Sequence, residues 1–183
     1  MAFGEAGNVR GMSFNPLTNQ LYVINDLKPG QVDGQDKLYR VNPATGATTV
    51  IGLTGRTGIQ SLEFAPNGTA YGWDMAVNGF GLCTINLLTG QATDVNPAVG
   101  HRDIQGMAFA PDGSLIGVGS VDEYPYGTTL WKINVSTGTW LQSVSGPNTD
   151  IRGIAFIPEP VALGAPLMLM ALGSAGRRRT VAE

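Results

Sequence analysis

The eight-residue segment VRGMSFNP at residues 9–16 occurs three more times, with substitutions, as IQSLEFAP at 59–66, IQGMAFAP at 104–111 and IRGIAFIP at 151–158. We number the residues of this pattern one to eight. Positions one, four and six are apolar in every copy, and position eight is proline. Positions four and six lie on the same side of an extended chain, and proline ends a strand because it has no N–H to donate. The pattern therefore predicts one β-strand in each copy.

The copies start at residues 9, 59, 104 and 151, which gives spacings of 50, 45 and 47 residues. Turn-forming residues follow the first three prolines, and two of these turns contain Asn-Gly or Asp-Gly, which are strong hairpin signals. A second strand is expected after each turn. The turns lie at 17–19, 67–68 and 112–113, and the second strands at 20–25, 69–73 and 114–119.

A third set of segments also aligns, and each member ends in asparagine. A turn that finishes in Thr-Gly follows each of them, and its glycine suits a left-handed position that closes a short hairpin. A fourth strand comes next. The third strands are expected at 38–42, 82–86 and 130–134, the Thr-Gly pairs at 45–46, 89–90 and 137–138, and the fourth strands at 47–53, 91–95 and 139–144.

Four-stranded units with a period of 40 to 50 residues are typical of β-propeller blades. The repeat resembles the blades of the propeller superfamily that includes WD40, NHL and quinoprotein types, although the Trp-Asp and Gly-His pairs of WD40 are missing. We predict an all-β domain over residues 1–157. It has about three four-stranded antiparallel propeller-like blades, near 9–53, 59–96 and 104–145, and the opening strand of a fourth at 151–157. A β-sandwich of the same hairpins is the alternative.

Three blades and one strand do not close a ring, because propellers have about four to eight blades. An open stack exposes apolar faces and an unpaired strand edge. Either further blades precede Met1 in a longer chain, or copies associate to close the ring. The first residues contain neither a basic segment nor an apolar one, so they do not resemble a signal peptide, which favours the longer chain.

Composition excludes several classes of protein. With 43% hydrophobic residues the chain can form a core, and a net charge of −3 gives no basic footprint for nucleic acid. Cys83 is the single cysteine and His101 the single histidine, which excludes an intrachain disulfide, a thiolate metal cluster and a multi-histidine site. A nucleophilic dyad of these two residues is conceivable. A half-buried strand thiol and a loop imidazole are the more economical interpretation.

Residues 158–183 differ from the repeats. The uncharged run 161–175 precedes three arginines, and it predicts a short apolar C-terminal helix. At about 15 residues the run is shorter than the roughly 20 that span a bilayer. The arginines fit the positive-inside rule, with the C-terminus cytoplasmic and the repeats outside. A core helix that ends in solvated arginines is the alternative.

This tail resembles the PEP-CTERM sorting signal of Gram-negative bacteria. Pro158, Glu159 and Pro160 match the signature tripeptide, residues 161–176 the transmembrane part, and Arg177, Arg178 and Arg179 the basic end. The resemblance implies cleavage near the tripeptide by an exosortase-type protease, and export to the cell envelope or beyond, often with exopolysaccharide. The short apolar run, Pro166 and the missing signal peptide depart from the family pattern.

Three acidic residues follow the second strands at a spacing of 48 residues: Asp26, Asp74 and Asp122. In a ring of blades they would share one rim, where their carboxylates could bind Ca²⁺. The favoured interpretation is that each aspartate bonds its own turn, so no metal is expected. The recurring aromatic residues could form a platform that stacks on sugars, although blade packing is the more frequent role. They are Tyr22, Tyr39, Tyr71, Trp73, Trp131 and Trp140.

No phosphate-binding loop, paired-carboxylate motif or nucleophile elbow occurs in the sequence. We therefore expect no catalysis, no catalytic residue and no cofactor. The predicted function is an exported, envelope- or exopolysaccharide-associated binding module. Its expected partners are the exosortase-type protease, a polysaccharide or envelope protein, the membrane through the tail, and further copies if the chain is complete. The alternative is a fragment of an extracytoplasmic propeller enzyme of lyase or lactonase type, with its active site on missing blades.

Overall fold

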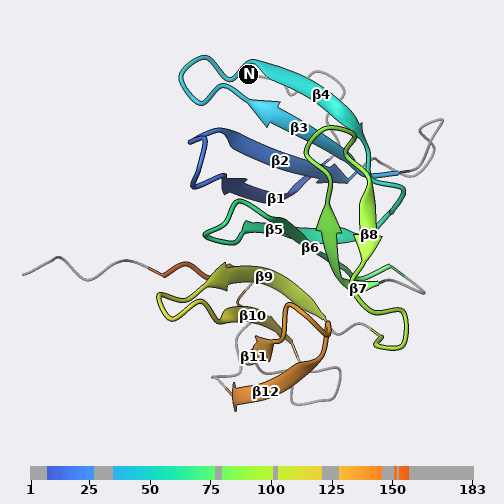
Figure 1. Cartoon of the computed structure of the whole chain (residues 1–183), viewed down its shortest axis with the longest axis vertical. Helices are drawn as coiled ribbons and strands as arrows, with labels where there is room; N and C mark the ends of the chain where they lie inside the picture. The colour runs from blue at the N-terminus through green and yellow to red at the C-terminus, as the bar shows by residue number, and fades with distance from the viewer. Residues whose placement is uncertain are drawn as a thin grey trace, which may run out of the picture.

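The computed structural model of the chain describes residues 8–26, 35–76, 80–100, 103–120, 128–145, 151 and 153–156. Within these residues each repeat forms one four-stranded antiparallel sheet with its strands in sequence order (Figure 1). The first sheet contains β1 (Asn8–Phe14), β2 (Leu21–Asp26), β3 (Lys37–Val41) and β4 (Thr48–Leu53). The second contains β5 (Ile59–Phe64), β6 (Ala70–Asp74), β7 (Gly81–Ile85) and β8 (Ala92–Asp94). The third contains β9 (Ile104–Phe109), β10 (Leu115–Ser120), β11 (Thr128–Ile133) and β12 (Trp140–Ser145).

These sheets confirm the predicted all-β fold of three propeller-like blades. The turn between the third and fourth strands has the same construction in each blade. Gly46, Gly90 and Gly138 have φ angles of 72°, 83° and 66°, the left-handed conformation expected for them. The asparagine that precedes each turn, for example Asn42, accepts hydrogen bonds from the backbone N–H groups two and three residues later. The recurring asparagine therefore fixes the turn.

The blades stack on one another, so that β1 lies beside β5 and β5 beside β9 (Figure 1). Apolar side chains fill the space between successive sheets. Ile24 and Leu38 of the first blade share a buried cluster with Ile59 of the second. Trp73 of the second blade shares another with Ile104 of the third. The middle sheet is thus apolar on both faces, which a two-sheet sandwich would not require.

After β12 the chain returns to the innermost position of the stack. Residues 153–156 lie against β9 and line a hollow with it, where the opening strand of a fourth blade is expected. The predicted C-terminal helix, and the tail 158–183 as a whole, fall outside the described residues. No helix that is both apolar and long enough to cross a membrane is found in the part of the chain that the structure describes.

Candidate functional site

Each innermost strand carries a β-bulge at position two of the repeat pattern. The pairing of β1 with β2 passes from Val9 to Gly11, and the pairings of β5 and β9 skip the equivalent residue. The skipped residues are Arg10, Gln60 and Gln105. Because a bulge inserts one residue and redirects its side chain, all three repeats present a polar group at the same place. We call these three side chains the position-two row.

Two members of the position-two row bond to one another, and the third bonds within its own blade. Arg10 Nη1 donates to Gln60 Oε1 at 2.6 Å, and this bond joins the first blade to the second. Gln105 Nε2 donates to the carboxylate of Asp103 at 3.0 and 3.3 Å. Guanidinium and amide groups together offer several donors and acceptors along one surface.

A carboxylate lies at position five of the second repeat. Glu63 Oε2 accepts a hydrogen bond from Ser13 Oγ at 3.0 Å, and its carboxylate also accepts one from the backbone N–H of Phe109. Burial raises the pKa of Glu63 above its ordinary value, although the Ser13 and Phe109 bonds act in the opposite direction. This carboxyl group therefore contacts all three blades.

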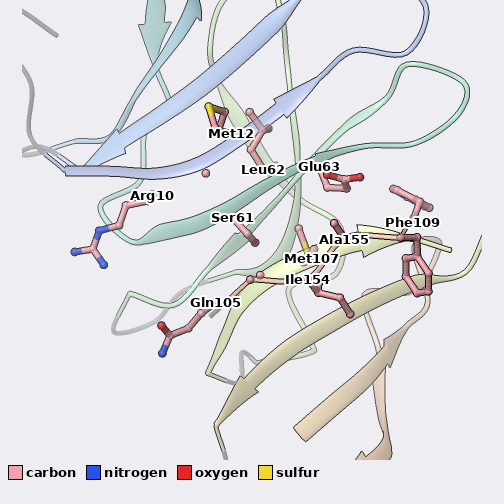
Figure 2. A pocket seen from close by; sticks show the side chains of 15 residues that line it. Arg10, Met12, Ser61, Leu62, Glu63, Gln105, Met107, Phe109, Ile154 and Ala155 are labelled. Carbon is pink, nitrogen blue, oxygen red and sulfur yellow. The ribbon is translucent and has the colours of Figure 1, made fainter. Parts of the chain in front are cut away.

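The innermost strands and residues 153–156 surround a hollow of about 350 Å³, the inner-strand pocket (Figure 2). Its walls combine the polar groups described above with apolar side chains, among them Met107, Phe109 and Ile154. Figure 2 shows the labelled side chains of β1, β5 and β9 gathered around this space. The volume lies within the range of ligand pockets, which starts at about 300 Å³.

Ser61 is the polar residue of this pocket that lacks a protein partner. It occupies position three, where the first repeat has Gly11, and its side chain is buried. Its hydroxyl makes no hydrogen bond with any atom of the described residues. A buried hydroxyl without a partner carries a desolvation cost of about 1–3 kcal/mol.

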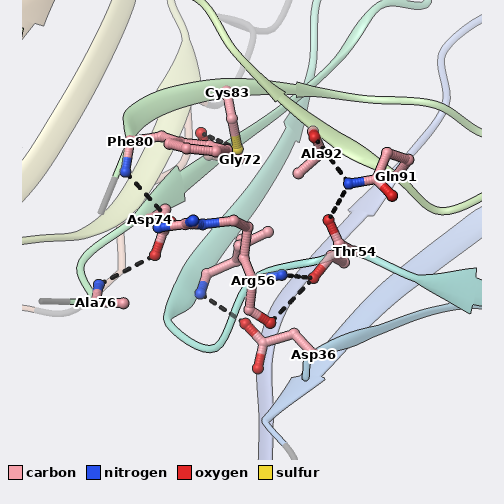
Figure 3. Close-up of polar contacts among 11 residues, drawn as sticks. Asp36, Thr54, Arg56, Gly72, Asp74, Ala76, Phe80, Cys83, Gln91 and Ala92 are labelled. Atoms are coloured by element: carbon pink, nitrogen blue, oxygen red, sulfur yellow. Dashed lines mark hydrogen bonds and ion pairs between the residues drawn. The ribbon is translucent and has the colours of Figure 1, made fainter. Parts of the chain in front are cut away.

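A second polar cluster lies between the first and second blades (Figure 3). The buried carboxylate of Asp74 forms an ion pair with Arg56 and accepts hydrogen bonds from the backbone N–H groups of Ala76 and Phe80 at 3.0 and 3.3 Å. The Arg56 guanidinium also lies 3.8 Å from the ring centroid of Phe80. Asp36 accepts a 2.7 Å bond from the backbone N–H of Ile59. The Asp36 and Asp74 carboxylates bond backbone N–H groups or an arginine. The cluster therefore holds the surrounding loops in place.

The three aspartates proposed as a rim have different settings. Asp74 bonds its own turn through Ala76, as the favoured interpretation predicts, and it adds the ion pair with Arg56. Asp26 is the last residue of β2, and Asp122 lies outside the described residues. Among the residues that the structure describes, no group of three or more histidine, cysteine, aspartate or glutamate side chains could hold a metal ion.

Cys83 lies in the core between the first two blades. Its Sγ is 3.4 Å from the backbone oxygen of Gly72, to which the thiol donates. Burial and, next, the negative charge of Asp74 raise the pKa of this thiol, so it stays protonated at neutral pH. His101 lies outside the described residues, so the structure does not test the conceivable dyad of Cys83 and His101.

The recurring aromatic side chains belong to the core. Tyr22, Tyr39, Trp73 and Trp131 are buried, and Tyr71 and Trp140 pack against the cluster between the second and third blades. This confirms the packing role and leaves none of them as an open stacking platform. The predicted sorting residues lie in the tail, outside the described residues. They are Pro158, Glu159, Pro160, Arg177, Arg178 and Arg179.

Sequence reasoning missed Glu63 and the position-two row. The signal that could have found the row is the polar residue at position two of an otherwise apolar pattern: Arg10, Gln60, Gln105 and Arg152. A strand that alternates apolar and polar residues explains one such residue, but its return in every copy marks a common surface. Glu63 gave no comparable signal, because positions five of the other repeats hold serine or alanine.

The model of a family described as "Repeat of unknown function (DUF6923)" matches residues 5–159. No curated protein matches the chain. Solved structures similar to it include the crystal structure of a nidogen/laminin complex, with 12% identity and a TM-score of 0.55 over 75% of this chain and 48% of that one. An auxiliary nutrient binding protein from Bacteroides thetaiotaomicron VPI-5482 shares 11% identity, with a TM-score of 0.58 over 84% and 34% of the two chains. Hydrazine synthase from Kuenenia stuttgartiensis shares 14%, with a TM-score of 0.52 over 80% and 40%.

The chain therefore spans less than half the length of each of these three structures. At such low identity the likeness concerns the fold alone. Together with the three blade-like sheets, the family match and these neighbours show a repeat protein with a β-propeller-like fold.

Proposed function

The chain belongs to the DUF6923 repeat family, and we propose that it is a non-catalytic binding module of the cell envelope that binds polysaccharide in its inner-strand pocket. The observation that carries this proposal is the lining of that pocket, which combines the polar side chains of Arg10, Gln105 and Glu63 with the apolar side chains of Met107 and Phe109.

The chemistry of the pocket fits a sugar. Each sugar hydroxyl both donates and accepts hydrogen bonds, and the pocket offers donors on Arg10 and Gln105 and an acceptor on Glu63. The C–H faces of a sugar ring need apolar contacts, which Met107 and Phe109 supply. Ligand pockets commonly combine apolar walls with a few polar groups that set the orientation.

The same pocket argues against hydrolysis. Of the described residues that line it, Glu63 is the one carboxylate. Glycoside hydrolysis commonly needs two carboxyl groups on either side of the scissile bond. A single carboxylate that bonds Ser13 and Phe109 is suited to hold a hydroxyl group in place.

The fold is compatible with a binding role. One neighbour of similar fold is named an auxiliary nutrient binding protein. At 11% identity this neighbour supports only the scaffold, and the sugar is inferred from the pocket residues of this chain.

The test is titration of the full chain with purified bacterial exopolysaccharides and their oligosaccharides by isothermal calorimetry. We expect saturable binding that Gln105→Ala weakens about tenfold, since this variant loses one bond worth roughly 1–1.5 kcal/mol. Gln20→Ala is the matched control, because Gln20 lies at the turn between β1 and β2, lines another hollow and faces solvent. Release of sugar products during the titration, or weakening by Gln20→Ala alone, would contradict the proposal.

We also propose that the tail is a sorting signal, at which an exosortase-type protease cleaves the chain. Support comes from the ordered tripeptide, apolar run and arginines of residues 158–179. The test is the intact mass of the chain expressed in a Gram-negative host with an exosortase-type protease. We expect cleavage near Pro160, which removes about 23 residues (183 − 160) from the 19.2 kDa chain. Replacement of residues 158–160 by alanine should leave the tail attached. A chain that keeps its tail in both forms and stays in the cytosol would exclude this part.

A further inference from the structure

Equivalent residues of the three inner strands differ sharply in exposure. At position four, Leu62 and Met107 are 3% and 5% exposed, whereas Met12 of the first blade is 61% exposed. At position six, Phe64 is 4% exposed and Phe14 is 48%. The residues are alike in chemistry, so the difference comes from what packs against each blade. The first blade presents an apolar face that its equivalents bury.

The contact that covers these residues follows one rule. Position three of one blade lies over position four of the next, and a Cβ on Gly11 would come within 2.5 Å of the Leu62 nitrogen. At the first interface, a residue without a side chain fits this contact. An aromatic contact accompanies it, with the rings of Tyr22 and Phe64 5.4 Å apart. The next interface repeats that contact, with Tyr71 and Phe109 5.9 Å apart.

The other end of the stack exposes a position-three residue, which is the half of this contact that Gly11 supplies at the first interface. Gly153 is position three of the fourth copy of the pattern, and a Cβ placed on it would meet nothing within 4 Å. Its backbone is therefore uncovered at the place where Gly11 packs on Leu62. Ile154, the next residue, lines the inner-strand pocket beside Met107. The molecule thus exposes a position-four side chain at one end and a free position-three glycine at the other.

We propose that a second copy of the chain docks head to tail, with β1 of one copy against residues 153–156 of the other. Met12 then packs over Gly153 of the neighbouring copy, as Leu62 packs over Gly11 within one chain. The occupant is a second copy because the two exposed surfaces match the two halves of the contact that Gly11 and Leu62 form within the chain. A head-to-tail contact either closes into a ring or extends into a filament. Met12 and residues 153–156 also line the inner-strand pocket, so the contact is tested without any sugar present.

Sedimentation velocity of the full chain over a wide concentration range tests the proposal. We expect multiples of the 19.2 kDa mass at high concentration and a shift to the monomer for Met12→Glu and for Gly153→Val. The second variant should keep the unfolding temperature of the wild type, since a Cβ at Gly153 would meet nothing within 4 Å. Gly100→Ala is the matched control, because a Cβ at Gly100 also meets nothing and that position lies outside the interface.

Mixing the two variants gives the decisive result. Met12→Glu retains an intact position 153 and Gly153→Val retains an intact β1, so the mixture should form a one-to-one dimer that cannot extend. A chain that stays monomeric at every concentration overturns the proposal. Association that neither variant reduces also overturns it, because the contact would then lie elsewhere, for example in the tail. A mixture of the two variants that remains monomeric overturns it as well.

Discussion

The Asp74 carboxylate satisfies two backbone N–H groups and one guanidinium from inside the protein. Replacement by alanine would remove the negative charge that Asp74 places beside Arg56, in a site that is largely shielded from water. We expect Asp74→Ala to lower the free energy of unfolding by about 3–5 kcal/mol. Urea denaturation followed by tryptophan fluorescence measures the loss. Lys132→Ala, on an exposed strand position, is the control, and a loss no larger than that of the control would contradict the structural role of Asp74.

The raised pKa of Glu63 makes a prediction about pH. A carboxyl group whose native pKa lies above its unfolded value stabilises the protein at low pH, and this stabilisation is lost as the pH rises through the native pKa. Glu63→Gln removes the charge and retains an oxygen that accepts from Ser13 and Phe109. The unfolding temperature of Glu63→Gln should therefore rise relative to wild type between about pH 4 and pH 7. A difference that is constant or falls over that range would show that burial does not dominate the pKa of Glu63.

Single residues show where sequence reasoning reaches its limit. The bond between Asp74 and the Ala76 N–H spans two positions, and a strand-ending aspartate predicts it. The ion pair joins Arg56, in the loop between β4 and β5, to Asp74, 18 positions later at the end of β6, and no local pattern indicates it. The Ser13–Glu63 bond joins residues 50 positions apart and occurs in one repeat only. Such contacts require the packing of whole blades, which the sequence specifies only through the repeat.

At the scale of elements, the left-handed glycines of the turns serve two purposes that can be separated. Gly113 and Gly90 have φ angles of 82° and 83°. A Cβ on Gly113 would meet nothing within 4 Å, whereas one on Gly90 would lie 2.7 Å from the backbone of Gly52 in β4. The turn of the second blade therefore also forms part of the contact with the first.

We expect Gly113→Ala to cost about 1–2 kcal/mol, from the left-handed conformation alone. Gly90→Ala should cost about 1–3 kcal/mol more, since β4 must move away from the new methyl group. Chemical denaturation of both variants under the same conditions measures the two costs. Equal costs would show that the first and second blades separate freely at this turn.

The strands and turns of the three complete blades were predictable within one or two residues, because their signals are local. The Asn of each third strand and the Gly four residues later, for example Asn42 and Gly46, act within one hairpin. The bulges at Arg10, Gln60 and Gln105 were not predicted. A bulge depends on how a strand pairs with its neighbour, and the eight-residue pattern reads the same with or without one.

For the whole molecule, a stack in which each blade contacts only its neighbours has a stability that varies along the stack. The second blade is buried on both faces, against Ile24 on one side and Ile104 on the other. The first blade exposes Met12 and Phe14. The free energy of local opening should therefore be highest in the second blade.

Hydrogen exchange measured by mass spectrometry tests this gradient. Amides of β6 and β7 should exchange slowest, because they occupy the middle of the doubly covered sheet, and those of β4 and β12 fastest, because these are the edge strands of the end sheets. The experiment uses Gly153→Val, in which the proposed head-to-tail contact is blocked and the end blades receive no protection from a second copy. In wild type at high concentration, protection of β1 should then increase while that of β6 stays the same. Uniform exchange over the three sheets would mean that the stack unfolds as one cooperative unit, so that burial on both faces gives the second blade no local advantage.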